Sequence, residues 1–330
     1  LSQFTEWRPY QHEVLAFIDG QQVPVPFNLN SLHALLPKSL ADSLELKLIA
    51  HFGYGVKVPI LELREIDDNE LKFLADFIYE KIFVNYTAKQ WGKRPEDISP
   101  EVTGRVPVHI SRDNRYFQDK YQAVPRLGYT KVFENMLNHP NISLLLNTDF
   151  KDVFKVDFAT GAMQFMGSEF NGQLIFTGLI DELFENRFGE LPYRSLAFQF
   201  EHLNTDQFQQ KTTINYPNDY DFTRITEFKH ISGQIIAGTS TVKEFPQDFD
   251  RNDPKKDIPY YPIFTDENKQ KLDRYLSFAE QFDNITLVGR LAENRYYDMD
   301  DIVARALQVF AYEFWYTKNT KGLLIIQNQL

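Results

Sequence analysis

Apolar and polar residues alternate near the start of the chain, on both sides of Asp19-Gly20 within residues 14–25. Alternation with a period of two is typical of a strand with one buried face. An Asp-Gly pair readily adopts the positive φ angles of a tight turn. The pattern therefore predicts a β-hairpin at this point.

The spacing becomes helical over residues 30–86, where apolar positions recur every three to four residues, most clearly in residues 71–83. This periodicity predicts a helical subdomain. Three prolines and a glycine then interrupt any regular pattern in residues 95–107, which predicts a loop.

The rest of the chain alternates between short elements. We expect a helix at 130–137, buried strands at 142–146 and 174–176, and an antiparallel sheet from strands near 196–200, 212–216, 223–228 and 234–242. A strand at 285–288, the turn Gly289-Arg290 and a helix at 298–316 follow. Such a turn points backbone N–H groups at an anion, although many α/β folds contain one and bind nothing.

Composition and charge narrow the possible functions. The 330 residues are 43% hydrophobic and 15% aromatic, enough for one large domain or two to three smaller ones. A formal net charge of -11 argues against nucleic-acid binding, so a few placed arginines must hold any anionic ligand. The absence of cysteine excludes disulfides, thiolate metal sites and a cysteine nucleophile, and we name no metal site. With no apolar run of membrane-spanning length and no signal-like start, we expect a soluble, cytoplasmic protein.

Several blocks of sequence carry residues suited to binding a nucleotide. They are YTAKQWG at 86–92, a segment from RVPV to DNRYF at 105–117, FTRITEFKH at 222–230, PYYP at 259–262 and GRLAENRYYDM at 289–299. In order and content, from about residue 14 to 307, they resemble the UDP-galactopyranose mutases of the bacterial type.

The resemblance implies an α/β fold: a Rossmann-like FAD-binding domain with an inserted helical bundle and a six-stranded antiparallel sheet. The helical bundle would comprise residues 30–115, the sheet domain 1–29 and 187–262, and the FAD-binding part 125–186 and 283–330. The implied enzyme is an isomerase that interconverts UDP-galactopyranose and UDP-galactofuranose for galactofuranose-containing cell-surface glycans. Reduced FAD would attack the anomeric carbon through N5, forming a covalent adduct without net redox change, and the enzyme would be a homodimer.

By resemblance, Arg105 and Arg224 bind the diphosphate and are the catalytic residues. Arginine suits this role because it stays protonated and directs two N–H donors at phosphate oxygens. Without the resemblance, each would more often be a surface or ion-paired arginine. Arg105 lies in the predicted loop, so we interpret residues 97–108 as a lid; a static connector is the alternative.

The resemblance also implies further ligand contacts. Aromatic rings would stack on uracil, although Phe83 and Trp91 would otherwise be simple core residues. Asp298 would otherwise be only a helix N-cap, and both roles can hold together. The substrate-binding residues would be Asn30, Phe83, Tyr86, Trp91, Tyr116, Arg194, Asn215, Tyr261 and Tyr296, and the FAD-binding residues Arg290, Tyr297, Asp298 and Met299.

The chain departs from the family pattern in two ways. The N-terminal G-x-G-x-x-G turn that holds the FAD pyrophosphate is not found, from which we expect poor FAD binding and little turnover by this chain alone. Ile82 and Asn294 stand where the family often has aromatic residues, which leaves local packing open. The alternatives are a non-catalytic UDP-sugar-binding fragment and a related flavin oxidoreductase.

Overall fold

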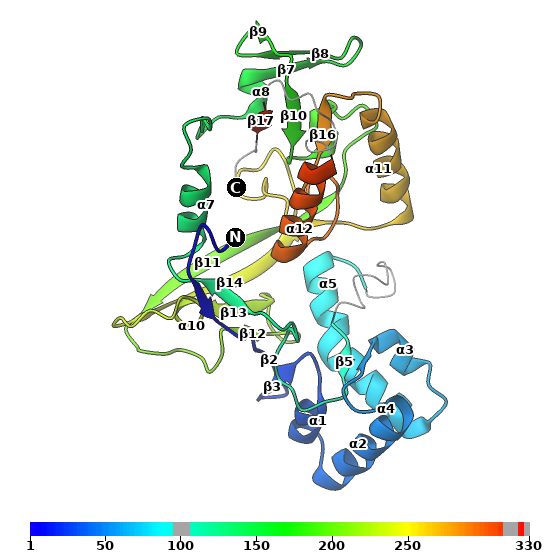
Figure 1. The fold of residues 1–330 in the computed structure, drawn as a ribbon. Coiled ribbons are helices and arrows are strands. Elements are labelled where there is room, and N and C mark those ends of the chain that lie inside the picture. The colour runs from blue at the N-terminus through cyan, green and yellow to red at the C-terminus, as the bar shows by residue number, and fades with distance from the viewer. Residues whose placement is uncertain (95–105, 313–322, 327–330) are drawn as a thin grey trace. The chain divides into compact units, whose positions relative to one another are not determined.

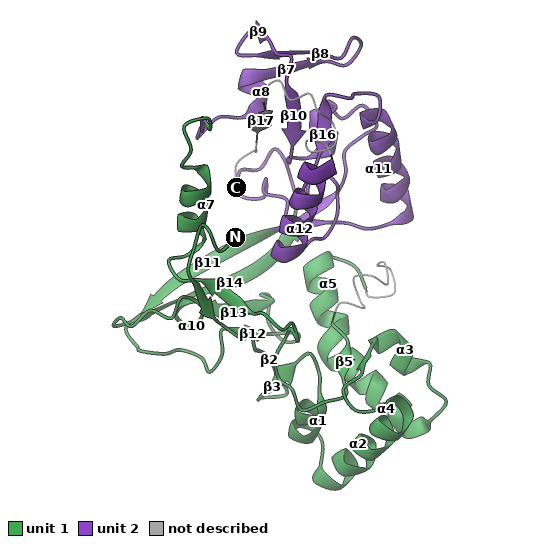
Figure 2. Cartoon of the chain, viewed as in Figure 1, with its two compact units in different colours: residues 1–142, 196–248 green, residues 143–195, 249–330 purple. Residues whose placement is uncertain are grey.

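The computed structural model describes residues 1–94 and 106–312, together with the backbone of residues 323–326. These residues form two compact units, shown in green and purple in Figure 2. Unit 1 comprises residues 1–142 and 196–248, and unit 2 comprises residues 143–195 and 249–330. The three-part division inferred from the sequence stays a prediction.

The predicted hairpin near the start of unit 1 is present (Figure 1). Strands β2 (Val14–Ile18) and β3 (Gln21–Val25) pair antiparallel, with Val14 opposite Val25. Asp19 and Gly20 form the turn with φ angles of 48° and 84°, the left-handed region that this pair tolerates. Local sequence is therefore sufficient to form this element.

The helical stretch predicted in unit 1 is also present. Its helices are α1 (Leu29–Leu35), α2 (Lys38–Phe52), α3 (Ile60–Arg64), α4 (Asn69–Ile78), the π-helix η1 (Tyr79–Val84) and α5 (Asn85–Trp91). Asn28 and Asp68 cap α1 and α4 with their side chains. Leu32, Leu44 and Leu74 are fully buried in the core of this bundle. Burial of one stripe of each helix is what stabilises these short elements.

The large sheet is mixed rather than wholly antiparallel. Among the described residues it has seven strands, in the order β15-β11-β14-β13-β12-β2-β3. Besides the hairpin strands β2 and β3, the sheet contains β11 (Tyr193–Leu203), β12 (Thr213–Asn215), β13 (Arg224–Glu227), β14 (Thr239–Asp248) and β15 (Tyr261–Pro262). The expected antiparallel arrangement is wrong for one pair, because β2 and β12 run parallel. These two strands are joined by a long crossover rather than a hairpin, which allows parallel pairing.

Shorter elements complete unit 1. Strand β1 (Trp7–Pro9) pairs with β6 (Ala123–Pro125), and β4 (Lys57–Val58) pairs with β5 (Val108–His109). Helix α10 (Phe228–Ser232) follows β13 directly. Helix α7 (Tyr129–Leu137) confirms the helix predicted at 130–137.

Unit 2 contains the α/β part of the chain. Strand β10 (Gln173–Phe176) pairs in parallel with β16 (Ile285–Leu287) and with β17 (Leu323–Ile326), confirming the strands predicted at 174–176 and 285–288. Its other elements are α8 (Phe150–Val153), β7 (Phe154–Asp157), β8 (Ala162–Phe165), β9 (Ser168–Glu169), α9 (Ile180–Leu183), α11 (Asp266–Ala279) and α12 (Met299–Phe310). Phe176, Phe184 and Tyr275 are fully buried in the core of this unit.

The strand predicted at 142–146 is wrong. These residues form no regular structure, and Ile142, Leu144 and Leu146 are 44%, 57% and 72% exposed. A short apolar run forms a strand only where another strand satisfies its backbone groups, and the described residues supply no such neighbour here. In the described part of the chain, no helix has the length and hydropathy needed to cross a membrane.

Candidate functional site

Three polar residues lie in one row across strands β12, β13 and β14 of unit 1. Arg224 begins β13 and is directly opposite Asn215 on β12 and Glu244 on β14. Directly opposed residues in antiparallel strands present their side chains on the same face. Arg224 Nε lies 3.3 Å from Glu244 Oε2. The sheet register therefore places a guanidinium between an amide and a carboxylate.

Helix α5 brings an aromatic hydroxyl to this row. The Tyr86 hydroxyl accepts a hydrogen bond of 2.9 Å from an Arg224 terminal nitrogen, across 138 residues of sequence. The structure thus brings together three of the residues named from the sequence, Tyr86, Asn215 and Arg224. The Asn215 Oδ1 atom is shielded from solvent and has no hydrogen-bond partner among the described residues, so it is available to a ligand donor.

Burial and charge shape the electrostatics around Arg224. Burial raises the pKa of Glu244, and the nearby Arg224 guanidinium opposes that shift. Burial, with a smaller effect from Arg224, lowers the pKa of His12 to about 4. His12 is therefore neutral near pH 7 and adds no second positive charge beside the guanidinium.

Tyr116 contacts His12, and Asn30 binds the segment that precedes Tyr116. The ring of Tyr116 meets that of His12 edge to face, with centroids 5.8 Å apart, and the Tyr116 N–H donates to the His12 carbonyl. Asn30, on α1, donates to the Arg112 carbonyl at 3.0 Å and to Asn114 Oδ1 at 2.8 Å. Its amide therefore holds the segment that leads to Tyr116.

Phe83 and Trp91 are largely buried. Phe83 is 7% exposed and packs in the core of the helical bundle, as its alternative interpretation expects. Trp91 is 9% exposed and ends α5, where Gly92 takes the left-handed conformation of a helix C-cap. Neither ring offers a broad exposed face for stacking on a base in this conformation.

A second group of predicted residues lies within unit 2. The Arg290 guanidinium carbon is 4.1 Å from the centroid of the Tyr296 ring and 5.5 Å from that of Tyr261, both within cation–π range. The two rings are stacked at 5.6 Å. Tyr261 on β15 is opposite Arg194 on β11, and Arg194 is only 7% exposed.

The start of α12 carries the predicted FAD-binding residues. Asp298 forms a capping box with Asp301, which confirms its N-cap role. Arg290 donates weakly to the Tyr297 carbonyl at 3.4 Å, and its Nε atom is shielded without a partner among the described residues. Met299 is 63% exposed. The Nε–H of Arg290 is thus shielded from solvent, makes no hydrogen bond among the described residues, and lies near the N-terminus of α12. Such a donor fits the anionic or carbonyl-bearing edge of a cofactor.

Ile82 and Asn294, which stand where the family often has aromatic residues, both fit their local surroundings. Asn294 has a φ angle of 48°, which asparagine tolerates better than an aromatic residue. Its side chain also donates to the Tyr193 hydroxyl at 2.7 Å. Ile82 is partly buried against the core of the helical bundle. Both residues are therefore accommodated by their surroundings.

Arg105 and most of the predicted lid, residues 97–105, lie outside the described residues. Sequence reasoning did not name Glu244 or His12. Neither belongs to a recognisable motif, since only the strand register and the approach of residue 12 to the sheet bring them to Arg224.

Comparison with known proteins identifies the family. The family model for UDP-galactopyranose mutase matches residues 81–296. The chain is 33% identical over 323 residues to a dTDP-fucopyranose mutase of Escherichia coli, covering 97% of this chain and 81% of that protein. It is 33% identical over 310 residues to a probable UDP-galactopyranose mutase of Klebsiella pneumoniae, covering 93% of this chain and 75% of that protein.

A third relative and a solved structure agree with this result. A UDP-galactopyranose mutase of Mycoplasma pneumoniae is 32% identical over 308 residues, covering 92% of this chain and 76% of that protein. A crystal structure of reduced UDP-galactopyranose mutase has the same fold, with a TM-score of 0.65 at 14% identity, covering 95% of this chain and 80% of that one. The resemblance found in the sequence is confirmed: this chain belongs to the UDP-galactopyranose mutase family.

Proposed function

We propose that the chain interconverts the pyranose and furanose forms of UDP-galactose. The observation that carries this proposal is the Arg224–Tyr86 hydrogen bond of 2.9 Å, formed by two blocks that lie within the family match. A guanidinium held by a carboxylate on one side and a phenol on the other is oriented for a bidentate grip on a diphosphate. The catalytic role of Arg224 is part of the proposal.

The protein's task in such a reaction is to stabilise the leaving group. As the bond between the sugar and the diphosphate breaks, negative charge develops on the phosphate oxygens, and Arg224 offers N–H donors to it. Glu244 restrains the guanidinium, so little reorganisation is needed when the charge forms. Neutral His12 leaves the positive charge concentrated on Arg224. By analogy with a lost oxyanion donor, removing Arg224 costs about 3 kcal/mol of transition-state stabilisation.

A flavin fits the residues at the start of α12. The mutases of this family are flavin-dependent. Reduced FAD, when bound, would supply an electron pair to the anomeric carbon. Arg290 would hold it through its shielded Nε donor, and Tyr297 would contribute its backbone. The stacked rings of Tyr261 and Tyr296 fix the Arg290 guanidinium in place.

The nucleotide and the sugar have a second candidate. The E. coli relative is named for dTDP-fucopyranose and matches 97% of this chain, slightly more than the relatives named for UDP-galactopyranose. The two nucleotides differ by the base methyl group and the ribose hydroxyl, and the two sugars by one hydroxyl group. Because the family model and the other relatives are named for UDP-galactopyranose, we propose UDP-galactose first and dTDP-fucose second.

The test supplies FAD in excess, because weak FAD binding is expected of this chain, and reduces it with dithionite. Each nucleotide-sugar is added as the pyranose, and the furanose product is separated chromatographically. Product from one substrate and not from the other assigns the specificity. An Arg224→Met variant should lose activity about a hundredfold, while Arg126→Met, an exposed arginine paired with Glu6, should retain it.

Binding supplies an independent readout. Titration with UDP, followed by calorimetry, should show at least tenfold weaker affinity for Arg224→Met. Unchanged UDP affinity in that variant would remove Arg224 from the site. The cytoplasmic location, the homodimer and the supply of galactofuranose to surface glycans remain predictions.

A further inference from the structure

The loop between β12 and β13 connects two residues of the proposed site. Its residues 216–222 lie between Asn215 and Arg224 in the sequence, followed by Thr223. The rings of Tyr216, Tyr220 and Phe222 contact one another, with centroids 4.9 to 5.1 Å apart. The three rings therefore pack the loop together between the ends of the two strands.

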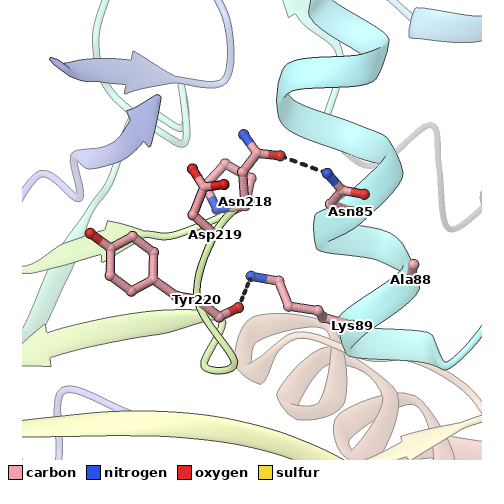
Figure 3. Close-up of a pocket in the computed structure, with 7 residues that line it drawn as sticks. Asn85, Ala88, Lys89, Asn218, Asp219 and Tyr220 are labelled. Carbon is pink, nitrogen blue, oxygen red and sulfur yellow. Dashed lines mark hydrogen bonds between the residues drawn. The ribbon is translucent and has the colours of Figure 1, made fainter. Parts of the chain in front are cut away.

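One lysine on α5 binds the backbone of this loop. The Lys89 ammonium donates to the carbonyls of Tyr216, Tyr220 and Phe222, the latter two at 3.1 and 3.2 Å. Figure 3 shows the Lys89 side chain reaching from α5 toward Tyr220. An ammonium has three donors, so these three carbonyls can use all of them. We call this arrangement the carbonyl clasp.

The contact between α5 and the loop is polar rather than tightly packed. Asn85, one turn before Lys89, donates to Asn218 Oδ1 at 2.9 Å, and Asn218 in turn donates to the Lys81 carbonyl at 2.9 Å. The Asn85–Asn218 bridge and the carbonyl clasp border a cavity of about 500 Å³ that is open to solvent (Figure 3). Because this cavity separates part of the loop from α5, the hydrogen bonds help to set where the loop lies on the helix.

Tyr86 lies between these bridging positions on the same helix. It is one residue after Asn85 and three before Lys89, and its hydroxyl accepts from Arg224. The bridges therefore hold the helix that carries Tyr86 against the loop that leads to Arg224. We propose that Lys89 is a positioning residue, which seats loop 216–222 on α5 so that Arg224 and Tyr86 meet at the diphosphate. This inference rests on the proposed function.

The protonation state of Lys89 affects the strength of the carbonyl clasp. Burial lowers the pKa of Lys89 to about 8, while the carboxylates of Asp219 and Asp221, which face it from the loop, act in the opposite direction. A neutral amine retains only two N–H donors for three carbonyls. The clasp therefore weakens as the pH rises through about 8.

The experiment measures the dissociation constant of UDP by calorimetry for the native chain and two variants. Lys89→Met removes the donors and keeps the length of the side chain. Lys81→Met is the matched control, because Lys81 lies in the adjoining π-helix and pairs with Asp19 in a hairpin turn that carries no site residue. We expect about tenfold weaker UDP binding for Lys89→Met and less than a twofold change for Lys81→Met.

The pH dependence of UDP affinity shows whether Lys89 acts through its ammonium group or only through the presence of its side chain. Between pH 7 and pH 9 the affinity of the native chain should fall more steeply than that of Lys89→Met, which has no proton to lose at this site. Hydrogen exchange of loop 216–222 should accelerate in Lys89→Met below its unfolding temperature. Native UDP affinity in Lys89→Met, or weak affinity with the native pH dependence, would overturn the positioning role. If the native chain itself does not bind UDP, the proposed function fails first.

Discussion

Replacing His12 by asparagine should make the protein more resistant to acid. Burial lowers the pKa of His12 to about 4 in the folded chain, whereas an unfolded histidine titrates near its ordinary value of about 6.5. Above pH 6.5 the residue is neutral in both states and does not affect stability. Between about pH 6.5 and 4 the unfolded chain binds a proton that the folded chain does not, so stability falls as the pH falls.

The size of this effect follows from the shift. Each pKa unit corresponds to about 1.4 kcal/mol, so a difference of about two and a half units gives a total acid-dependent loss of about 3.5 kcal/mol, of which about 3 kcal/mol develops between pH 7 and pH 4. Asparagine at position 12 retains an oxygen near the place of Nδ1, which lies 3.1 Å from the Tyr10 hydroxyl. The variant therefore keeps that hydrogen bond and loses the titrating group.

The assay is urea denaturation of the native chain and His12→Asn at intervals between pH 7 and pH 4. The difference in unfolding free energy between the two should shift by about 3 kcal/mol in favour of the variant across this range. Glu244 contributes with the opposite sign, because its raised pKa makes the folded state take up a proton first. Since that contribution is common to both proteins, it cancels in the difference. If the difference in unfolding free energy between the two proteins did not change with pH, His12 would not be buried and neutral in the folded chain.

Two further predictions concern stability. Arg251 binds the fully buried Asp181, so Arg251→Met should lower the unfolding free energy by about 3–5 kcal/mol in thermal or urea denaturation, because it leaves a buried carboxylate unpaired. The exposed Arg126→Met should cost under about 1 kcal/mol, and equal losses would contradict this reasoning. Gly238 has a φ of 75°, and a Cβ there would lie 3.1 Å from the Leu203 carbonyl oxygen, so Gly238→Ala should cost about 1–3 kcal/mol in the same denaturation assays. Gly20 has a φ of 84° with open space around it, so Gly20→Ala should cost about 1 kcal/mol, and equal losses at the two sites would show that backbone conformation alone matters.

Several features of the fold could be predicted from the sequence because their causes are local. The Asp19-Gly20 turn is determined by two adjacent residues that tolerate positive φ, and the helices of residues 30–86 by apolar positions along a single stripe. The family could be predicted as well, since its blocks are contiguous stretches of sequence. The strand predicted at 142–146 was wrong because an apolar pattern is local, whereas a strand needs a neighbouring strand to bind its backbone groups.

The candidate site depends on contacts that no local pattern contains. Arg224 meets Glu244 because β13 and β14 pair in one particular register, and a shift by one residue would turn that carboxylate to the other face of the sheet. Tyr86 meets Arg224 only after α5 packs over the strands. The sequence by itself determined the turn, the helices and the family. The tertiary structure decided which charges face one another, because hydrogen bonds and burial join residues far apart along the chain.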